Sequence, residues 1–332
     1  MQQRQLGKTG PKTFPLGLGC MGMSPDLYGP SDRAESLATL RMALDAEINL
    51  LDTGDFYGMG HNEMLLGEGM KGVARDRVLI SVKFGALRGP DNAWLGMDTR
   101  PAAIRNFVTY SLKRLGTDYI DIYRPARLDP NVPIEETVGA IADLIKEGYV
   151  RHIGLSEVGA EAIRRAHAVH PIADLQIEYS LISRSIENKI LPTCRELGIG
   201  ITAYGVLSRG LISGHWNRER TFGKGDFRAA SPRFQEGNID QNLALVEALR
   251  RIAEEKGVSV AQIAIAWVLN RDPLIVPLIG ARRRERLSEA LGALEFTLTA
   301  DELAAIEKAV PRDAAAGERY PEHGMASLDS ER

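Results

Sequence analysis

The sequence predicts an α/β fold, a closed (β/α)8 TIM barrel with an N-terminal β-hairpin and a long loop after the seventh strand. Six short apolar runs carry this prediction, and they end at Asp52, Lys83, Ala126, Ser156, Gln176 and Tyr204. Successive ends lie 31, 43, 30, 20 and 28 residues apart, which leaves room each time for two loops, a helix and the next strand. Such barrels need roughly 250 residues and carry their chemistry at the carboxyl ends of the strands.

The first two units can be followed along the chain. Residues 4–24 are expected to form a short hairpin and then the first barrel strand, which ends near residues 19–21. Residues 31–48 have apolar side chains at helical spacing, and Ser31 is a candidate N-cap. The apolar run after this helix supplies the second strand, which stops at Asp52.

The same alternation continues along the rest of the chain. Helices are expected in segments 62–72, 100–116, 134–148, 160–170, 187–198, 260–272 and 282–294, with strand runs between most of them. Three segments end in a glycine of the kind that caps helices, namely Gly116, Gly148 and Gly198.

Two segments fall outside this pattern. Residues 214–238 are polar and glycine-rich, and a loop of that length is usually functional or mobile. Residues 311–332 are charged without strong periodicity, and this tail either folds over the barrel mouth or stays loose. Neither resembles a linker, so we expect a single domain over residues 1–332.

Composition and charge narrow the class of protein. Apolar residues make up 44% and charged residues 26%, as in globular proteins, and the net charge of −3 argues against nucleic-acid binding. No apolar stretch approaches ~18 residues and no signal pattern is present, so we expect a cytoplasmic protein without a membrane partner. Cys20 and Cys194 cannot form a disulfide framework, and no residue cluster has zinc-ligand spacing. The oligomeric state stays open.

The most specific stretch is LLDTGDFYGMGHNEMLLG at residues 50–67. It places Asp52 at a strand end and Tyr57 in the loop before a helix, while Lys83 ends the next strand. A free tyrosine, with a pKa of about 10, is a weak acid at neutral pH. A nearby ammonium would lower that pKa, and Asp52 would keep Lys83 charged, so the three could protonate a carbonyl oxygen. The alternative is an ordinary buried salt bridge beside a loop aromatic.

Five further motifs follow in order: RPARLDP, GLSEVG, QIEYS, AYGVLSRGL and PLIGARRRERLSEAL. With residues 50–67 and Lys83 they make the chain similar to the aldo-keto reductase family from about residue 3 to about residue 310. The resemblance implies an NADP-dependent oxidoreductase that reduces a small aldehyde or ketone. It gives Tyr57 the role of proton donor, with Lys83 and Asp52 behind it.

One position departs from the family. A histidine usually precedes the Arg-Val-Asp-Pro part of the fourth-strand motif, and here the residue is Ala126. Loss of such a group typically costs ~10²–10⁴ in rate. Three interpretations remain: Tyr57 orients the carbonyl alone or with water, Arg124 or Arg127 substitutes as an electrophile, or the chain is a nicotinamide-binding regulatory or sensor protein with little or no turnover.

We expect no Rossmann-type Gly-x-Gly-x-x-Gly between a strand and a helix, and the resemblance implies NADPH extended across the barrel mouth instead. Ser156 and Gln176 would bind the nicotinamide carboxamide, and Tyr204 would stack on its ring. Glu157 stands where Asn is common. The other expected cofactor contacts are Gly19, Met21, Asp52, Gly205, Val206, Leu207, Ser208, Arg209, Gly280, Ala281, Arg282, Arg286, Glu289 and Ala290. The arginines favour a 2′-phosphate and hence NADPH over NADH, although a solvated basic helix end is the alternative.

Residues in the loops after the strands are expected to form the substrate pocket. These are Met23, Phe56, Phe84, Trp94, Arg124, Ala126 and Trp216. They suggest an apolar or aromatic carbonyl compound, with a sugar as the alternative, but loop aromatics serve packing as often as recognition.

Overall fold

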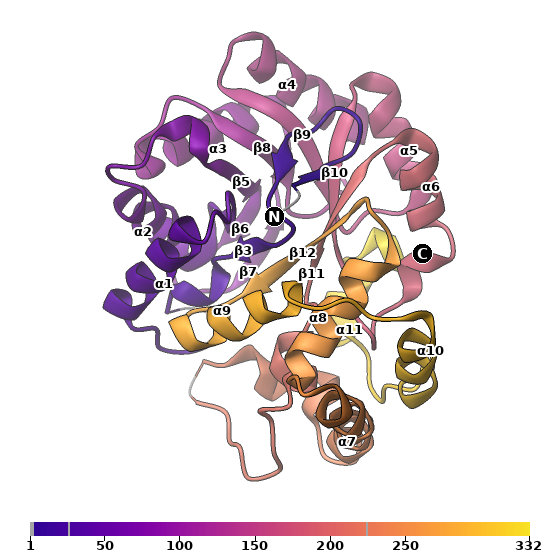
Figure 1. Cartoon of the computed structure of the whole chain (residues 1–332). Coiled ribbons are helices and arrows are strands. Elements are labelled where there is room, and N and C mark those ends of the chain that lie inside the picture. The colour runs from indigo at the N-terminus through magenta and orange to yellow at the C-terminus, as the bar shows by residue number, and fades with distance from the viewer. Residues whose placement is uncertain (1–2, 26, 224) are drawn as a thin grey trace.

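The centre of the computed structural model, which describes residues 3–25, 27–223 and 225–332, is a closed barrel of eight parallel strands (Figure 1). The barrel strands are β3 (Gly17–Gly19), β4 (Leu50–Gly54), β5 (Leu79–Phe84), β8 (Ile120–Pro125), β9 (Val150–Ser156), β10 (Ile172–Glu178), β11 (Gly200–Tyr204) and β12 (Ile275–Gly280). They neighbour one another in chain order, and β12 pairs with β3 to close the ring. The predicted fold class is confirmed.

Helices surround the barrel strands (Figure 1). They are α1 (Arg33–Asp45), α2 (His61–Gly69), α3 (Pro101–Leu115), α4 (Ile134–Lys146), α5 (Ala160–Val169), α6 (Ile190–Leu197), α7 (Asn238–Lys256), α8 (Val260–Arg271), α9 (Arg284–Leu291), α10 (Ala300–Ala309) and α11 (Glu322–Ala326). The apolar core fills the space between strands and helices, as the fully buried Trp267 of α8 illustrates. No helix in the described ranges is long and apolar enough to cross a membrane.

An antiparallel hairpin of β1 (Arg4–Gln5) and β2 (Lys12–Thr13) covers the amino-terminal end of the barrel. Its turn is tied to the chain before β11, where Lys8 N donates to Gly198 O at 2.7 Å. The carboxyl ends of the strands therefore lie at the opposite end, where barrel enzymes carry their sites. A second hairpin, β6 (Ala86–Arg88) and β7 (Trp94–Met97), lies in the loop after β5.

The barrel interior holds a buried polar cluster. Arg124 is fully buried, and its guanidinium contacts Asp174 at 3.0 Å and the Ser81 hydroxyl at 2.8 Å. Thr202 donates to the same Asp174 carboxylate at 2.7 Å. Because these partners enclose it, Arg124 does not face a substrate pocket, which corrects its expected role.

Most of the helix signals in the sequence were accurate, beginning with the three glycines. Gly116 and Gly198 are left-handed C-caps with φ of 66° and 71°, and Gly148, with φ of 87°, follows the end of α4. The N-cap of α1 is Asp32 rather than Ser31, because the Asp32 carboxylate accepts from Glu35 N at 2.9 Å. Helices α7, α10 and α11 were not predicted. The C-terminal tail folds against the end of β9 instead of staying loose.

Candidate active site

The carboxyl ends of β4, β5 and β10 bring three side chains into one hydrogen-bonded network. Lys83 Nζ contacts Asp52 Oδ1 and donates to Gln176 Oε1 at 2.7 Å. The Gln176 amide donates to Asp52 Oδ2 at 2.7 Å, and Ser81 donates to the same oxygen at 2.8 Å. Asp52 and Lys83 are only 5% and 6% exposed. A buried pair with its remaining sites hydrogen-bonded is held in one geometry.

Tyr57 follows β4 in a tight turn and lies beside this network. Residues 58–60 have φ of 56°, 51° and 91°, the left-handed region in which two of the three are glycine. Asn62 anchors the turn, because its side-chain oxygen accepts from the Thr53 hydroxyl at 2.7 Å. The Tyr57 ring is 6% exposed, and Lys83 Nζ lies 5.3 Å from the ring centroid.

The electrostatics of Tyr57 differ from the expectation. Burial raises the pKa of its phenol well above the usual range, the Asp52 charge raises it further, and the main opposing cation is Arg127 rather than Lys83. Burial also lowers the pKa of Lys83 in spite of Asp52. The prediction of a lowered Tyr57 pKa was therefore wrong, because desolvation outweighs the neighbouring ammonium.

Ala126 and Arg127 follow directly after β8. Ala126 is 2% exposed and carries no polar side-chain atom. Arg127 is half-buried, and its Nη1 donates to the Ala126 carbonyl oxygen at 2.6 Å. Its charge acts on both Tyr57 and Lys83, whereas Arg124 is enclosed in the barrel interior. Of the two arginines considered as substitutes for histidine, Arg127 is the one near the phenol.

The side chains that are expected to surround a nicotinamide lie at or near the ends of strands β9, β10 and β11. The Ser156 hydroxyl is buried, and no described residue provides it with a hydrogen-bond partner. The Tyr204 ring is half-buried, with its hydroxyl donating to Glu157 at 2.7 Å. An unpaired hydroxyl beside a half-exposed ring fits a ligand that brings its own hydrogen-bonding group.

Glu157 is engaged by the protein itself. Its carboxylate accepts from Arg319 at 2.9 and 3.1 Å, from the Ser330 hydroxyl at 2.6 Å and from Glu178 N at 2.9 Å. Together with Tyr204, these donors occupy both carboxylate oxygens. The expected cofactor contact from the Glu157 side chain is therefore corrected to a contact with the C-terminal tail.

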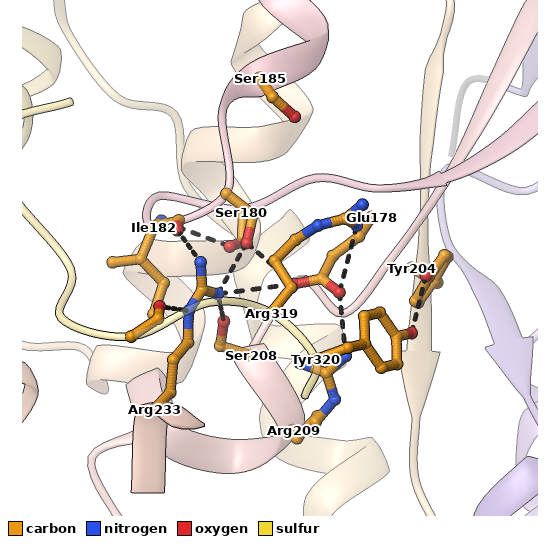
Figure 2. Close-up of polar contacts among 12 residues, drawn as sticks. Glu178, Ser180, Ile182, Ser185, Tyr204, Ser208, Arg209, Arg233, Arg319 and Tyr320 are labelled. Atoms are coloured by element: carbon orange, nitrogen blue, oxygen red, sulfur yellow. Dashed lines mark hydrogen bonds and ion pairs between the residues drawn. The ribbon is translucent and has the colours of Figure 1, made fainter. Parts of the chain in front are cut away.

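A second buried carboxylate, Glu178, collects three guanidinium groups. The distances from its oxygens are 3.1 Å to Arg209, 3.5 Å to Arg233 and 3.4 Å to Arg319. Figure 2 shows these arginines around Glu178, and Tyr320 beside Tyr204, whose hydroxyls are 3.0 Å apart. Arg319 also pairs with Glu157 and with Glu331 of the tail, so three carboxylates balance the three guanidinium groups.

The comparisons with known proteins agree with this geometry. The sequence model of the Aldo/keto reductase family matches residues 15–311. The chain belongs to the aldo/keto reductase family. It is 40% identical over 322 residues to a probable aldo-keto reductase 1 from Glycine max, covering 96% of this chain and 92% of that one.

Two solved structures of aldo/keto reductases or related dehydrogenases share the fold. A glycerol dehydrogenase from Gluconobacter oxydans is 30% identical, with a TM-score of 0.84 over 92% of this chain and 94% of its own. A thermostable aldo-keto reductase, Tm1743, solved with the inhibitor epalrestat, is 27% identical, with a TM-score of 0.75 over 93% of this chain and 100% of its own.

The remaining residues expected to contact the cofactor lie at the ends of β3, β11 and β12, in the loops that follow these strands and in α9. Ser208 and Arg209 have φ of 46° and 59°, and such strained non-glycine residues cluster at functional sites. Gly205, Val206 and Leu207 precede them in the same loop, and Gly19 pairs with both Asp52 and Gly280 at the strand ends. Met21 follows in the short turn after β3.

The start of α9 carries the expected phosphate-binding arginines. Arg286 Nη1 donates to Glu289 at 3.1 Å and contacts His215 Nε2 at 2.5 Å, with the side chain 44% exposed. Arg282 donates to the carbonyls of Tyr28 and Pro30 at 3.3 and 3.0 Å. Arg286 is therefore the more available of the two. Ala281 and Ala290 are 4% and 2% exposed in the apolar core, so their side chains are placed away from the rim.

The expected substrate residues divide into two groups. Trp94, 50% exposed, packs edge-on against Phe56, and Phe56 against Tyr57, so these aromatics border the phenol. Phe84 is a correction: it stacks on Tyr123 at 4.2 Å, on the helix side of the barrel. Successive strand side chains alternate, so Phe84 faces away from Lys83.

Two more pocket predictions are corrected. Met23 is fully buried in the main core. Trp216 is 6% exposed and packs with Phe222 and Phe234 at 5.2 and 4.9 Å, within the long loop and the turn that follows it.

Sequence reasoning missed four residues of this rim, Glu178, Arg233, Arg319 and Tyr320. Glu178 ends the buried strand β10, and a charge at a strand end was a usable signal. Arg319 and Tyr320 lie in a tail without periodicity, and nothing in the sequence indicates that they reach the barrel mouth.

Proposed function

We propose that this aldo/keto reductase uses NADPH to reduce a small aldehyde or ketone to the alcohol, with Tyr57 as the proton donor. The observation that carries the proposal is the buried Tyr57 phenol beside the Lys83–Asp52–Gln176 network, with Lys83 Nζ 5.3 Å from the ring centroid. When bound, the cofactor would supply a hydride. The protein would then have to supply orientation and a proton.

The residues at the rim fit a nicotinamide cofactor. The unpaired Ser156 hydroxyl suits the carboxamide, and the Tyr204 ring offers a surface on which a flat ring can stack. Gln176 uses its oxygen and one N–H within the network, which leaves its second N–H for the same carboxamide. Glu157 would act only through Tyr204, to whose hydroxyl it is bonded.

The chemistry assigned to this chain is a proton transfer in a desolvated site. Because the Tyr57 pKa is raised, the phenol stays protonated at neutral pH and above, so it holds the proton that the reaction consumes. As the carbonyl carbon is reduced, its π electrons move to oxygen, and that oxygen takes the Tyr57 proton. The phenolate then recovers a proton from water. Lys83, held by Asp52, keeps a positive charge beside that phenolate.

The choice of NADPH rests on charge at the start of α9. Arg286 is nearly half exposed, and among the residues that the structure describes its guanidinium contacts Glu289, Glu285 and His215. A 2′-phosphate could replace these exposed partners with a bidentate contact, which NADH cannot offer. The substrate would be a small carbonyl compound that approaches past Phe56 and Trp94.

Ala126 supports one rival function, a nicotinamide-binding regulatory or sensor protein with little turnover. The test follows NADPH absorbance with a panel of aliphatic, aromatic and sugar aldehydes and, in parallel, titrates NADPH by fluorescence quenching. Turnover supports the enzyme. Cofactor binding without turnover on any member of the panel would favour the sensor, and absence of binding would reject both.

A further inference from the structure

One cation near the proposed site, Arg127, forms no ion pair with any residue that the structure describes. Arg127 donates to its neighbour's carbonyl oxygen at 2.6 Å, and no ion pair within the described ranges includes it. Arg127 is also half-buried, so its charge is partly withdrawn from water. A desolvated guanidinium without a carboxylate is a natural place for an incoming negative charge.

The neighbouring arginines are different, because each is neutralised by the protein. Arg124 pairs with Asp174, Arg209 and Arg233 with Glu178, Arg228 with Asp226, and Arg319 with Glu157. These guanidinium groups already have the anion that they need. Arg127 is thus set apart from five arginines that have structural partners.

The position of Arg127 relates it to both halves of the proposed site. It directly follows Ala126, the residue at the position where the family usually has its histidine, just beyond the end of β8. The Arg127 charge lowers the pKa of both Tyr57 and Lys83. Burial lowers the pKa of Arg127 itself, but Tyr204, Tyr320 and Glu157 raise it overall. A carbonyl between Tyr57 and the Tyr204 ring would therefore be within its field.

We propose that Arg127 is the catalytic electrophile of this site, donating an N–H to the substrate carbonyl oxygen in place of the histidine that Ala126 replaces. This inference rests on the proposed carbonyl reduction. Arg127 gives up no proton: the carbonyl carbon gains the hydride, the π electron pair becomes negative charge on oxygen, and Tyr57 supplies the proton. The guanidinium stabilises that charge while it develops, as an oxyanion donor does.

The first experiment compares Arg127→Met and Arg127→Lys with the wild type on a neutral aldehyde. Removal of one oxyanion donor should reduce kcat roughly 100-fold or more in Arg127→Met, with the NADPH Kd unchanged, while Arg127→Lys should retain part of the activity. Arg77→Met, an exposed arginine at the amino-terminal end of the barrel, should behave like the wild type. Circular dichroism and thermal melting confirm that each variant is folded.

A pH profile separates catalysis from packing. Arg127 lowers the pKa of Tyr57, so its removal should move the alkaline limb of kcat/KM to higher pH as well as lower the plateau. Ala126→His introduced into Arg127→Met should restore part of kcat, because the imidazole would take over the same role. If the alkaline limb of kcat/KM did not move in Arg127→Met and Ala126→His restored none of its kcat, the effect of Arg127 would be structural and the inference would be overturned.

A pair of substrates tests the other use of a free guanidinium. Benzaldehyde is neutral and 4-carboxybenzaldehyde is anionic, and the inference predicts similar losses in kcat for both. A rise in KM confined to the anionic compound would make Arg127 a carboxylate anchor and contradict its action on the carbonyl. If the wild type reduces the aldehydes and Arg127→Met is just as active, this inference alone is overturned. If the wild type itself shows no activity, the inference and the proposed function are both rejected.

Discussion

Arg319 and Glu157 form a bidentate ion pair at 2.9 and 3.1 Å between residues 162 positions apart in the chain. The side chains are 5% and 0% exposed, so the C-terminal tail is locked onto the end of β9 beside Ser156. Burial alone would raise the pKa of Glu157, but the charge and hydrogen bonds of Arg319, with Arg127 and Ser330, together outweigh it and hold that pKa at about 2. The tail is therefore part of the barrel mouth.

Replacement of Arg319 by Met should destabilise the protein strongly. Two buried carboxylates, Glu157 and Glu178, would lose a counter-charge, and breaking a buried pair costs about 3–5 kcal/mol. Urea unfolding measures this loss, with Arg312→Met, an exposed arginine of the same tail, as the control. Glu157→Gln in the Arg319→Met background should recover part of the stability. If the double variant were no more stable than Arg319→Met, uncompensated charge would not be the cause.

Removal of Arg286 should discriminate between the two nicotinamide cofactors. Arg286→Ala should raise the Kd of NADPH roughly 10-fold, equivalent to about 1.4 kcal/mol, and leave the Kd of NADH nearly unchanged. Fluorescence titration measures both, and Arg251→Ala, exposed on α7, serves as the control. Equal weakening of the two cofactors would remove the assignment of Arg286 to a 2′-phosphate.

Asp55 should make stability depend on pH. Burial raises the pKa of Asp55 to about 8, and the Glu63 charge adds to the shift, against weaker opposing effects of the Gly85 and Phe56 backbone and of Arg114. A raised acid pKa stabilises the fold at low pH, and this contribution is lost as the pH rises from about 4 to about 8. Asp55→Asn should therefore gain roughly 2–5 kcal/mol relative to the wild type across that window.

Denaturant unfolding at several pH values checks the Asp55 prediction. The quantity of interest is the difference in unfolding free energy between the variant and the wild type, because other acids also titrate. Asp45→Asn, at an exposed position on α1, serves as the control. If the difference in unfolding free energy between Asp55→Asn and the wild type did not change with pH, the Asp55 carboxyl would not be held protonated.

The barrel could be predicted from the sequence because its signals are local. Each strand run ends at a polar or small residue, and glycines such as Gly116 stop the helices in left-handed caps. Strand alternation also contained a signal that was not used: Lys83 and Phe84 are consecutive, so they had to face opposite sides. That signal would have excluded Phe84 from the pocket.

The rest of the site depends on distant contacts and on burial. Glu157 resembles a cofactor ligand by position, but its use by Arg319 depends on where an aperiodic tail folds. The raised pKa of Tyr57 follows from the depth of its burial, which the residue types around it do not reveal. Arg127 likewise differs from Arg124 in being only half-buried and in forming no ion pair with a described residue, and both are properties of the folded chain.

The most direct test of the account is the effect of Tyr57→Phe on NADPH-dependent aldehyde reduction. Removal of the phenolic proton should lower kcat by ~10²–10⁴, while the NADPH Kd stays close to the wild-type value, because only one oxygen is lost. Steady-state turnover and fluorescence titration on the same preparation give both numbers. If Tyr57→Phe reduced the aldehyde as fast as the wild type, Tyr57 would not be the proton donor and the proposed mechanism would be wrong.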